Sequence, residues 1–252
     1  MINQLWYKNI WTLDIKNQSW VEDTENQVIF IIKTLGLKGN ERILDLACGF
    51  GRHSLSFASK GFDVIGIDIT EEYIRDAKNT AKKKNLKIEF INADIRELKY
   101  KNEFDIVFNL ADGAIGYLEN EEENLKIFDI ISNSLKINGK HFMDVCNAEH
   151  AENYFPKRHW EIGSKSLSLP EFQWDKKSRR MLYSQWEIEF GKIVDKPKTI
   201  EPGSSTRLYT KSEIARIFKE RGMKIIKTFS NYYGKEETYK ELQLIVYSKK
   251  IK

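Results

Sequence analysis

Residues 43–54, ILDLACGFGRHS, are the stretch that decides the fold. The apolar run that opens it predicts a buried strand, and the polar run from Arg52 predicts the first turn of a helix. Between the two, Gly49 and Gly51 permit a tight turn and a close approach of the backbone to a ligand. A strand, a glycine loop and a helix in this order are typical of the ligand-binding end of an open parallel sheet.

The same alternation of strand and helix continues along the chain. Further strands are expected at residues 62–69, 87–95, 104–111, 140–146, 224–233 and 241–250. Helices are expected at residues 22–36, 52–61, 70–85, 123–137 and 210–222. Gly139 is expected to end the fourth helix, and Thr210 with Glu213 forms a capping box at the start of the last one. Because the strands up to residue 146 are apolar almost throughout, they indicate a parallel sheet covered by helices on both faces.

The alternation breaks after residue 146. Residues 155–206 contain stretches that alternate between polar and apolar side chains, such as LYSQWEIEF, which predict three or four antiparallel strands. We therefore expect an α/β fold with a seven-stranded doubly wound sheet, built from residues 1–150 and 207–252. A small antiparallel β insert at residues 151–206 interrupts it.

Composition limits the possible environment and partners. The chain has 252 residues and a net charge of +4, a mild excess that does not require a nucleic-acid partner. Its apolar runs are shorter than the roughly 18–20 residues of a membrane span, and its first residues lack a signal-peptide pattern. A cytoplasmic location without membrane attachment is the expectation. The two cysteines, Cys48 and Cys146, do not have the pattern of a disulfide framework.

Three carboxylates follow the first three strands. Asp45 ends the first strand, Asp68 ends the second, and Asp94 ends the third. The carboxyl ends of parallel strands meet at one edge of a sheet, so these side chains should lie around the glycine loop. They can accept hydrogen bonds from an amine, from a ribose diol and from an exocyclic amine such as that of adenine. A phosphate would be repelled, so the ligand should be an adenosyl group without phosphates.

These motifs resemble those of class I S-adenosylmethionine-dependent methyltransferases, which have a Rossmann-like fold. Residues 43–54 are similar to the first family motif, with Ala47 in place of its first glycine, and the stretches VIGIDIT and INADI are similar to the second and third motifs. The resemblance is strong over residues 40–147 and topological over residues 207–250. It implies S-adenosylmethionine as cofactor and a small-molecule type of methyltransferase with an inserted lid. The implied cofactor-binding residues are Asp45, Ala47, Gly49, Gly51, Asp68, Ile69, Asp94, Ile95 and Asn109.

Other classes fit less well. A nicotinamide-dependent dehydrogenase would carry Gly-x-Gly-x-x-Gly, whereas Arg52, His53 and Ser54 follow Gly51 here. An RNA or protein methyltransferase and a non-catalytic S-adenosylmethionine-binding protein remain as alternatives. The weak net charge counts against RNA. We expect no metal, because no His/Cys pair has zinc spacing.

The stretch after the fourth strand reads FDIVFNLADGAIGYL and lies where the family has the motif that faces the methyl group. Methyl transfer from a sulfonium requires alignment more than a catalytic group, and a base only if the acceptor is protonated or a poor nucleophile. Asn109, Asp112 and Tyr117 are the candidate catalytic residues. A carboxylate at position 112 can hold a cationic acceptor or take its proton. A loop-capping role for Asp112 and a core position for Tyr117 are the simpler alternatives.

The acceptor site is expected under the insert. Candidate substrate-binding residues are Trp174, Arg207, Tyr209 and His150. Packing within the insert, or an ion pair within the protein for Arg207, would explain them equally well. The aromatic residues of the insert can also form a homodimer face. The N-terminal segment, residues 1–38, is expected to act as a lid over the cofactor, although burial of its aromatic residues against the insert is an alternative.

Overall fold

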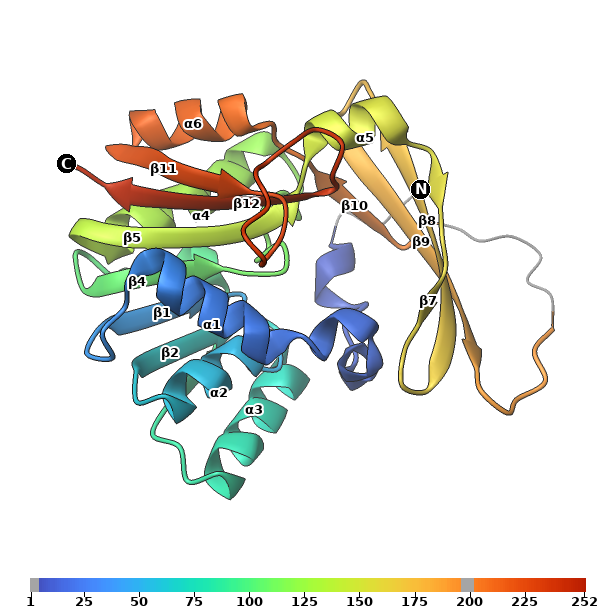
Figure 1. Ribbon diagram of the computed structural model, residues 1–252, viewed down its shortest axis with the longest axis horizontal. Helices are drawn as coiled ribbons and strands as arrows, with labels where there is room; N and C mark the ends of the chain where they lie inside the picture. Colours follow the sequence, from blue (N-terminus) through green and yellow to red (C-terminus); the bar gives the residue numbers. More distant parts are fainter. Residues whose placement is uncertain (1–4, 196–201) are drawn as a thin grey trace.

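The computed structural model describes residues 5–195 and 202–252 and contains two β-sheets (Figure 1). The larger sheet has seven strands in the order β11-β12-β5-β4-β1-β2-β3. Its strands are β1 (Arg42–Leu46), β2 (Asp63–Asp68), β3 (Glu89–Asn92), β4 (Phe104–Asn109), β5 (Leu135–Cys146), β11 (Met223–Phe229) and β12 (Gln243–Lys250). Strands β1 to β5 run parallel to one another, and β12 runs antiparallel to both of its neighbours, β5 and β11. The predicted seven-stranded Rossmann-like sheet is thus confirmed.

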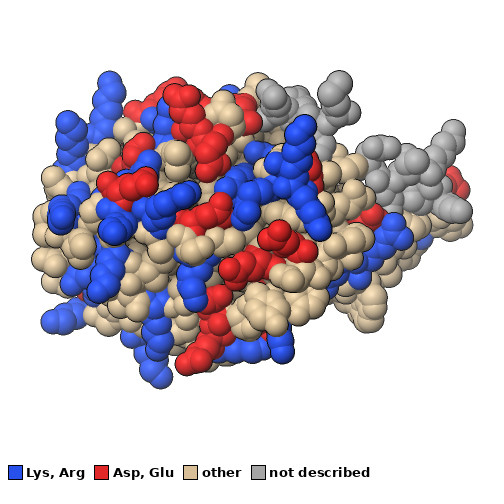
Figure 2. Space-filling model, turned by 90° about the horizontal axis from the view of Figure 1, so that it is seen from above, with Lys and Arg blue, Asp and Glu red and all other residues tan. Residues whose placement is uncertain are grey.

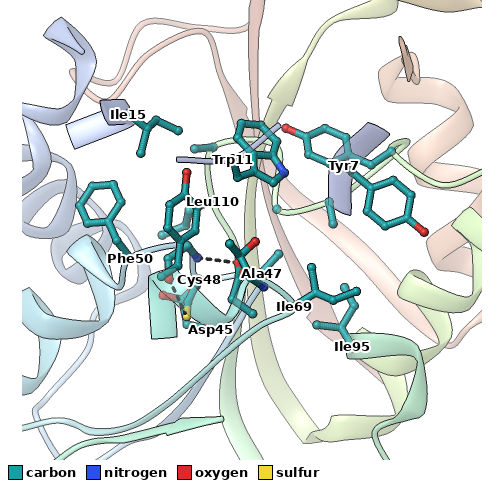
Figure 3. Close-up of a pocket in the computed structure, with 18 of the residues that line it drawn as sticks. Tyr7, Trp11, Ile15, Asp45, Ala47, Cys48, Phe50, Ile69, Ile95 and Leu110 are labelled. Atoms are coloured by element: carbon teal, nitrogen blue, oxygen red, sulfur yellow. Dashed lines mark hydrogen bonds between the residues drawn. The ribbon is translucent and has the colours of Figure 1, made fainter. Parts of the chain in front are cut away.

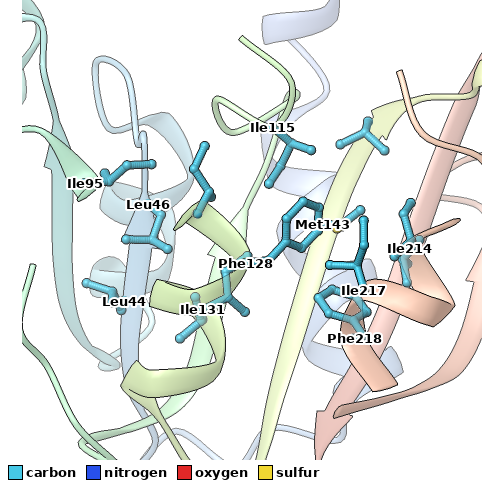
Figure 4. Close-up of a cluster of buried hydrophobic side chains, with 14 of the residues drawn as sticks. Leu44, Leu46, Ile95, Ile115, Phe128, Ile131, Met143, Ile214, Ile217 and Phe218 are labelled. Atoms are coloured by element: carbon cyan, nitrogen blue, oxygen red, sulfur yellow. The ribbon is translucent and has the colours of Figure 1, made fainter. Parts of the chain in front are cut away.

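Helices cover both faces of this sheet. On one face, α4 (Glu121–Ser134) and α6 (Lys211–Glu220) bury Phe128 and Phe218 against Leu44 of β1 and Met143 of β5 (Figure 4). On the other face lie α1 (Thr24–Leu35) and α2 (Arg52–Ser59), and α3 (Glu71–Lys83) packs beside α2 near the β3 edge. The capping box of Thr210 and Glu213 opens α6 as expected.

The fourth helix ends earlier than the sequence indicates. We expected a helix over residues 123–137 ended by Gly139, but α4 stops at Ser134 and β5 begins at Leu135. Leu135 is fully buried and pairs with Phe104 of β4, so tertiary packing draws the last apolar residues into the sheet. Gly139 is needed for another reason: a Cβ there would lie 2.8 Å from the carbonyl oxygen of Lys136.

The smaller sheet lies between β5 and α6 in the sequence and stands beside the larger one in space (Figure 1). It follows α5 (Ala148–Tyr154) and contains five strands where three or four were expected. These are β6 (Lys157–Arg158), β7 (Glu161–Ile162), β8 (Ser166–Asp175), β9 (Arg180–Glu189) and β10 (Ser204–Arg207). The long β8–β9 hairpin carries the alternating pattern, and the two-residue strands β6 and β7 are too short to show one.

The N-terminal segment, residues 5–21, lies between the two sheets (Figure 1). It forms three short 3₁₀ helices, η1 (Trp6–Lys8), η2 (Leu13–Asn17) and η3 (Ser19–Val21). The Trp6 indole donates to the Ser205 carbonyl of β10 at 3.2 Å, and the Tyr7 hydroxyl donates to Glu119 at 2.9 Å. Among the described residues of the segment predicted as a lid, residues 5–21 contact both sheets, whereas α1 packs onto the larger sheet.

Among residues 5–195 and 202–252, no helix combines the length and the apolar character that crossing a membrane requires.

Candidate active site

A narrow cavity of about 130 Å³ lies at the carboxyl ends of β1, β2, β3 and β4 (Figure 3). Three sets of residues line it: the glycine loop, the ends of the neighbouring strands, and aromatic residues of the N-terminal segment. Its lining includes Asp45, Ala47, Cys48, Gly49, Phe50, Asp68, Ile69, Asp94, Ile95, Tyr7, Trp11, Trp20, Leu110 and Tyr117. The predicted cofactor residues are thereby brought together, apart from Gly51 and Asn109, which support the cavity from behind its lining.

The glycine loop has a left-handed backbone. The φ angles of Ala47, Gly49 and Gly51 are 54°, 58° and 76°. A Cβ at Gly51 would lie 2.7 Å from the Phe90 ring, so only glycine fits there. Ala47 adopts the conformation that glycine favours and still has room for its methyl group.

Asp68 organises the floor of the cavity. Its two carboxylate oxygens accept hydrogen bonds from the backbone N–H groups of Gly49 and Thr70, both at 2.8 Å. Burial raises the pKa of this carboxyl, and the two N–H donors oppose the rise. Each oxygen keeps a further lone pair, which suits the diol of a ribose.

Asp45 is almost fully buried and accepts a 2.5 Å hydrogen bond from the Ser54 hydroxyl of α2. Burial raises the pKa of Asp45 to about 7. Because ionisation is costly in this environment, a cationic group near Asp45 would be stabilised by the carboxylate and would stabilise it in turn.

Asp94 is held differently from the other two carboxylates. Arg96 donates to both of its oxygens through the guanidinium, and the Arg96 N–H donates to one of them. These contacts hold the pKa of Asp94 below its usual range despite partial burial. The carboxylate lines the cavity but is largely occupied, so an adenine amine would have to share it with Arg96.

The loop after β4 has an unusual backbone. Ala111, Asp112, Gly113 and Ala114 all have φ between 51° and 67°, four consecutive residues in the left-handed region. Such a turn is strained by roughly 1–2 kcal/mol for each residue other than glycine, and strain of this kind concentrates at functional sites. Asn109, which is fully buried, holds the turn by donating to the Gly113 carbonyl at 2.8 Å.

Asn109 therefore faces the protein rather than the cavity, and its amide oxygen lies 3.2 Å from His141 Nε2. Asp112 and Tyr117, by contrast, face open space. Both line a second cavity, and the Tyr117 hydroxyl donates to Asp112 at 3.2 Å. The N–H of Cys146 donates to the other oxygen of Asp112, also at 3.2 Å.

Asp144, on β5, lies next to Asp112. The Asp112 N–H donates to the Asp144 carbonyl at 2.7 Å, and the Tyr232 hydroxyl donates to the Asp144 carboxylate at 2.9 Å. Burial raises the pKa of each carboxyl to about 6, and the charge of Asp144 adds to the rise at Asp112. We call Asp112 and Asp144 the carboxyl pair. Sequence analysis missed Asp144, although a carboxylate two residues before the end of an otherwise apolar strand was a usable signal.

The second cavity is larger, about 630 Å³, and lies between the two sheets. The N-terminal segment, the carboxyl pair and the inner face of the insert surround it. Its lining includes Trp6, Trp11, Asp14, Trp20, Arg52, Asp112, Tyr117, Asp144, Cys146, Glu161, Phe172, Tyr183, Glu187 and Gln243. Trp11 and Tyr117 line both cavities, and their stacked rings have centroids 6.0 Å apart. The two cavities therefore meet along a shared boundary that includes this aromatic pair; Ile15, Trp20, Arg52, Tyr73 and Ala111 also line both.

The four predicted substrate-binding residues lie outside the linings of both cavities. Trp174 packs against the apolar core of the insert, and His150 Nδ1 donates to the Tyr239 carbonyl at 3.2 Å. Arg207 is paired with Glu213 at 2.7 Å and lies over the Tyr209 ring. The simpler alternatives, packing and an internal ion pair, describe their surroundings.

Comparison with known proteins agrees with the geometry of the site. The family model of the methyltransferase domain matches residues 37–222, so the chain belongs to this family. Its fold is that of class I methyltransferases, whose cofactor is S-adenosylmethionine. A crystal structure of an S-adenosylmethionine-dependent methyltransferase from Clostridium acetobutylicum superposes with a TM-score of 0.75. It is 18% identical and covers 93% of this chain and 96% of that one.

Curated relatives are similar over part of the chain. A putative methyltransferase of Geobacillus sp. (strain WCH70) is 30% identical over 145 residues, 58% of each protein. The glycine/sarcosine N-methyltransferase of Aphanothece halophytica is 28% identical over 159 residues, 61% of this chain and 60% of that protein. The chain thus spans about half to three fifths of the length of the curated relatives it matches.

Proposed function

We propose that this protein transfers a methyl group from S-adenosylmethionine to a small molecule bound in the second cavity. The observation that carries the proposal is the junction of the two cavities at Trp11 and Tyr117. A donor in the cavity beside the glycine loop and an acceptor in the cavity beneath the insert would meet there. Holding the two reactants in line supplies much of the rate enhancement of a displacement reaction.

The residues of the first cavity suit the methyl donor. Asp68 would hold the ribose diol, Asp45 would face the cationic amine, and Ile69 and Ile95 would pack against the base. Bound S-adenosylmethionine supplies an electrophilic methyl group on a positively charged sulfur. Trp11 and Trp20 of the N-terminal segment line the same cavity, where they would shield the bound donor from water.

Two measurements test this function. Calorimetry should detect binding of S-adenosylmethionine and of its demethylated product, and absence of binding at millimolar ligand would refute it. A metabolite extract incubated with labelled methyl donor should then yield a labelled small molecule. Recovery of label only in protein or RNA would replace the small-molecule acceptor by a macromolecule.

Two further expectations remain proposals. RNA methylation would need a basic surface, and Figure 2 shows acidic and basic side chains intermixed on the face it displays. Salt-dependent binding to total RNA would favour that alternative. The second expectation is dimerisation through the insert, where Trp160 and Ile162 expose 64% and 60% of their surface. Light scattering would measure the mass of the protein in solution and test it.

A further inference from the structure

We propose that the acceptor is an amine that enters the second cavity as a cation, and that Asp112 and Asp144 receive it. This inference rests on the proposed function and names the substrate class of the same site. It is carried by the charge, the aromatic lining and the position of the cavity relative to the methyl-donor site.

The first step is the charge of the cavity. Within the part of the chain that the structure describes, its lining contains five carboxylates and one guanidinium. The carboxylates are Asp14, Asp112, Asp144, Glu161 and Glu187. The whole chain carries a net charge of +4, so this concentration of negative charge departs from the average surface. A cationic ligand is attracted to such a cavity and an anionic one is repelled.

The one guanidinium does not offset this preference. Arg52 donates to the Thr24 hydroxyl at 2.7 Å and to the Gln27 amide oxygen at 2.8 Å, and it lies 5.0 Å from the centroid of the Trp20 ring. Both hydrogen bonds come from Nη1, and the charge of Arg52 also favours the ionised form of Asp144. One guanidinium against five carboxylates still leaves an excess of negative charge in the cavity, which disfavours an acidic acceptor.

The second step is the aromatic wall. Trp6, Trp11 and Trp20 of the N-terminal segment line the cavity together with Phe172 and Tyr183 of the insert, and Tyr117 packs against Trp6 and Trp11. Aromatic faces attract an ammonium group, and they do so most strongly where water is excluded. Carboxylates together with aromatic rings therefore select a cation with apolar substituents rather than a strongly hydrated metal ion.

The third step is the location of the carboxyl pair. Gly113 lines the methyl-donor cavity, Ala111 lines both cavities, and Asp112 between them lines the acceptor cavity. The strained loop thus places a carboxylate at the boundary between the two reactants. Its two oxygens accept from the Tyr117 hydroxyl, the Cys146 N–H and the Cys146 thiol, which leaves one of their roughly four lone-pair positions for a ligand.

This position suits the proton balance of amine methylation. The ammonium nitrogen first gives a proton to the Asp112 carboxylate, which frees its lone pair. That lone pair forms the new nitrogen–carbon bond while the carbon–sulfur bond breaks and its electrons stay on sulfur. Positive charge then lies on nitrogen, where the carboxyl pair stabilises it, since its second member, Asp144, is able to stay ionised.

The test measures binding to the protein loaded with S-adenosylhomocysteine. Phenethylamine, 2-phenylethanol and 3-phenylpropanoate are titrated as cationic, neutral and anionic probes of similar shape. We expect the amine to bind about tenfold more tightly than the alcohol, and the carboxylate to bind least. Asp112→Asn should lower the affinity for the amine about tenfold and leave that for the alcohol unchanged.

A second variant guards against misfolding of the strained loop. Glu187 is exposed on β9 at the rim of the cavity, so Glu187→Gln should fold and weaken amine binding about threefold at low salt. Glu189→Gln removes the same charge two residues along the same strand, outside the lining, and should have no effect. Equal affinity for amine and alcohol, no binding of the amine at millimolar concentration, or no effect of either cavity variant would overturn the inference. Failure of the unmodified protein to bind S-adenosylhomocysteine would instead refute the proposed function.

Discussion

Asp68→Asn tests the assignment of the methyl-donor cavity most directly. The carboxylate receives one N–H from the glycine loop and one from Thr70, both at 2.8 Å, and presents its remaining lone pairs to the cavity. Asparagine has the same shape but only one accepting oxygen. Its NH2 group replaces one of the two oxygens and must therefore face the N–H of either Gly49 or Thr70, so two donors meet.

The expected loss follows from the energy of a hydrogen bond to a charged group, about 1.5–3 kcal/mol. Since about 1.4 kcal/mol corresponds to a factor of ten, the affinity for S-adenosylhomocysteine should fall roughly ten- to hundredfold. Calorimetry at constant pH and salt measures this change. Thermal unfolding of the ligand-free variant shows whether the variant has also lost stability. If one backbone N–H is left unpaired, the free energy of unfolding should fall by about 1–3 kcal/mol.

Asp63→Asn is the matched control. Asp63 begins the same strand, has a side chain that is 72% exposed, and lies at the end away from the cavity. It should leave the affinity unchanged. An Asp68→Asn protein that binds as tightly as the unmodified chain would show that the acid after β2 does not hold the ligand.

Three further outcomes follow from the structure. Amine binding should weaken as the pH falls through about 6, because both members of the carboxyl pair have a pKa of about 6 and protonation removes the charge that attracts the cation. Calorimetry between pH 5 and 8 would measure this loss of affinity, and a constant affinity over that range would contradict the prediction. Gly116→Ala should destabilise the fold by at least about 2 kcal/mol more than Gly61→Ala in denaturant unfolding. Both glycines have positive φ, but a Cβ at Gly116 would lie 1.9 Å from a β10 carbonyl oxygen whereas Gly61 has open space; equal losses would refute the steric argument. Trp11→Ala should lower the affinity for S-adenosylhomocysteine about three- to tenfold by opening the cavity, whereas the exposed-site control Trp160→Ala should leave it unchanged. Equal affinities of the Trp11→Ala variant and the unmodified protein would show that Trp11 does not help to close the cavity.

The larger sheet was predictable because its signals are local. Apolar runs, the glycine loop and the capping box at Thr210 each depend on residues a few positions apart. The fourth helix shows the limit of such signals. Residues 135–137 fit a helical pattern, yet pairing of Leu135 with β4 places them in a strand, and that pairing involves residues about thirty positions apart.

The candidate acceptor site was less predictable for the same reason. Asp112 and Tyr117 were found from their place after the fourth strand, whereas Asp144 belongs to the site only because β5 lies beside β4. Arg207 and Tyr209 were candidates from residue type alone, and in the structure their polar groups contact Glu213 and Glu121. Residue type near a site does not reveal whether a partner within the protein already satisfies the side chain.

The sequence by itself determined the class of ligand at the glycine loop. Strands that run parallel bring their carboxyl ends to one edge, so the spacing of Asp45, Asp68 and Asp94 was enough to predict an adenosyl group without phosphates. Only the tertiary structure decided the character of the second cavity, the proposed acceptor site. Its walls come from the N-terminal segment, the loop after β4, β5 and the insert, and no local pattern specifies how four distant segments pack around one space.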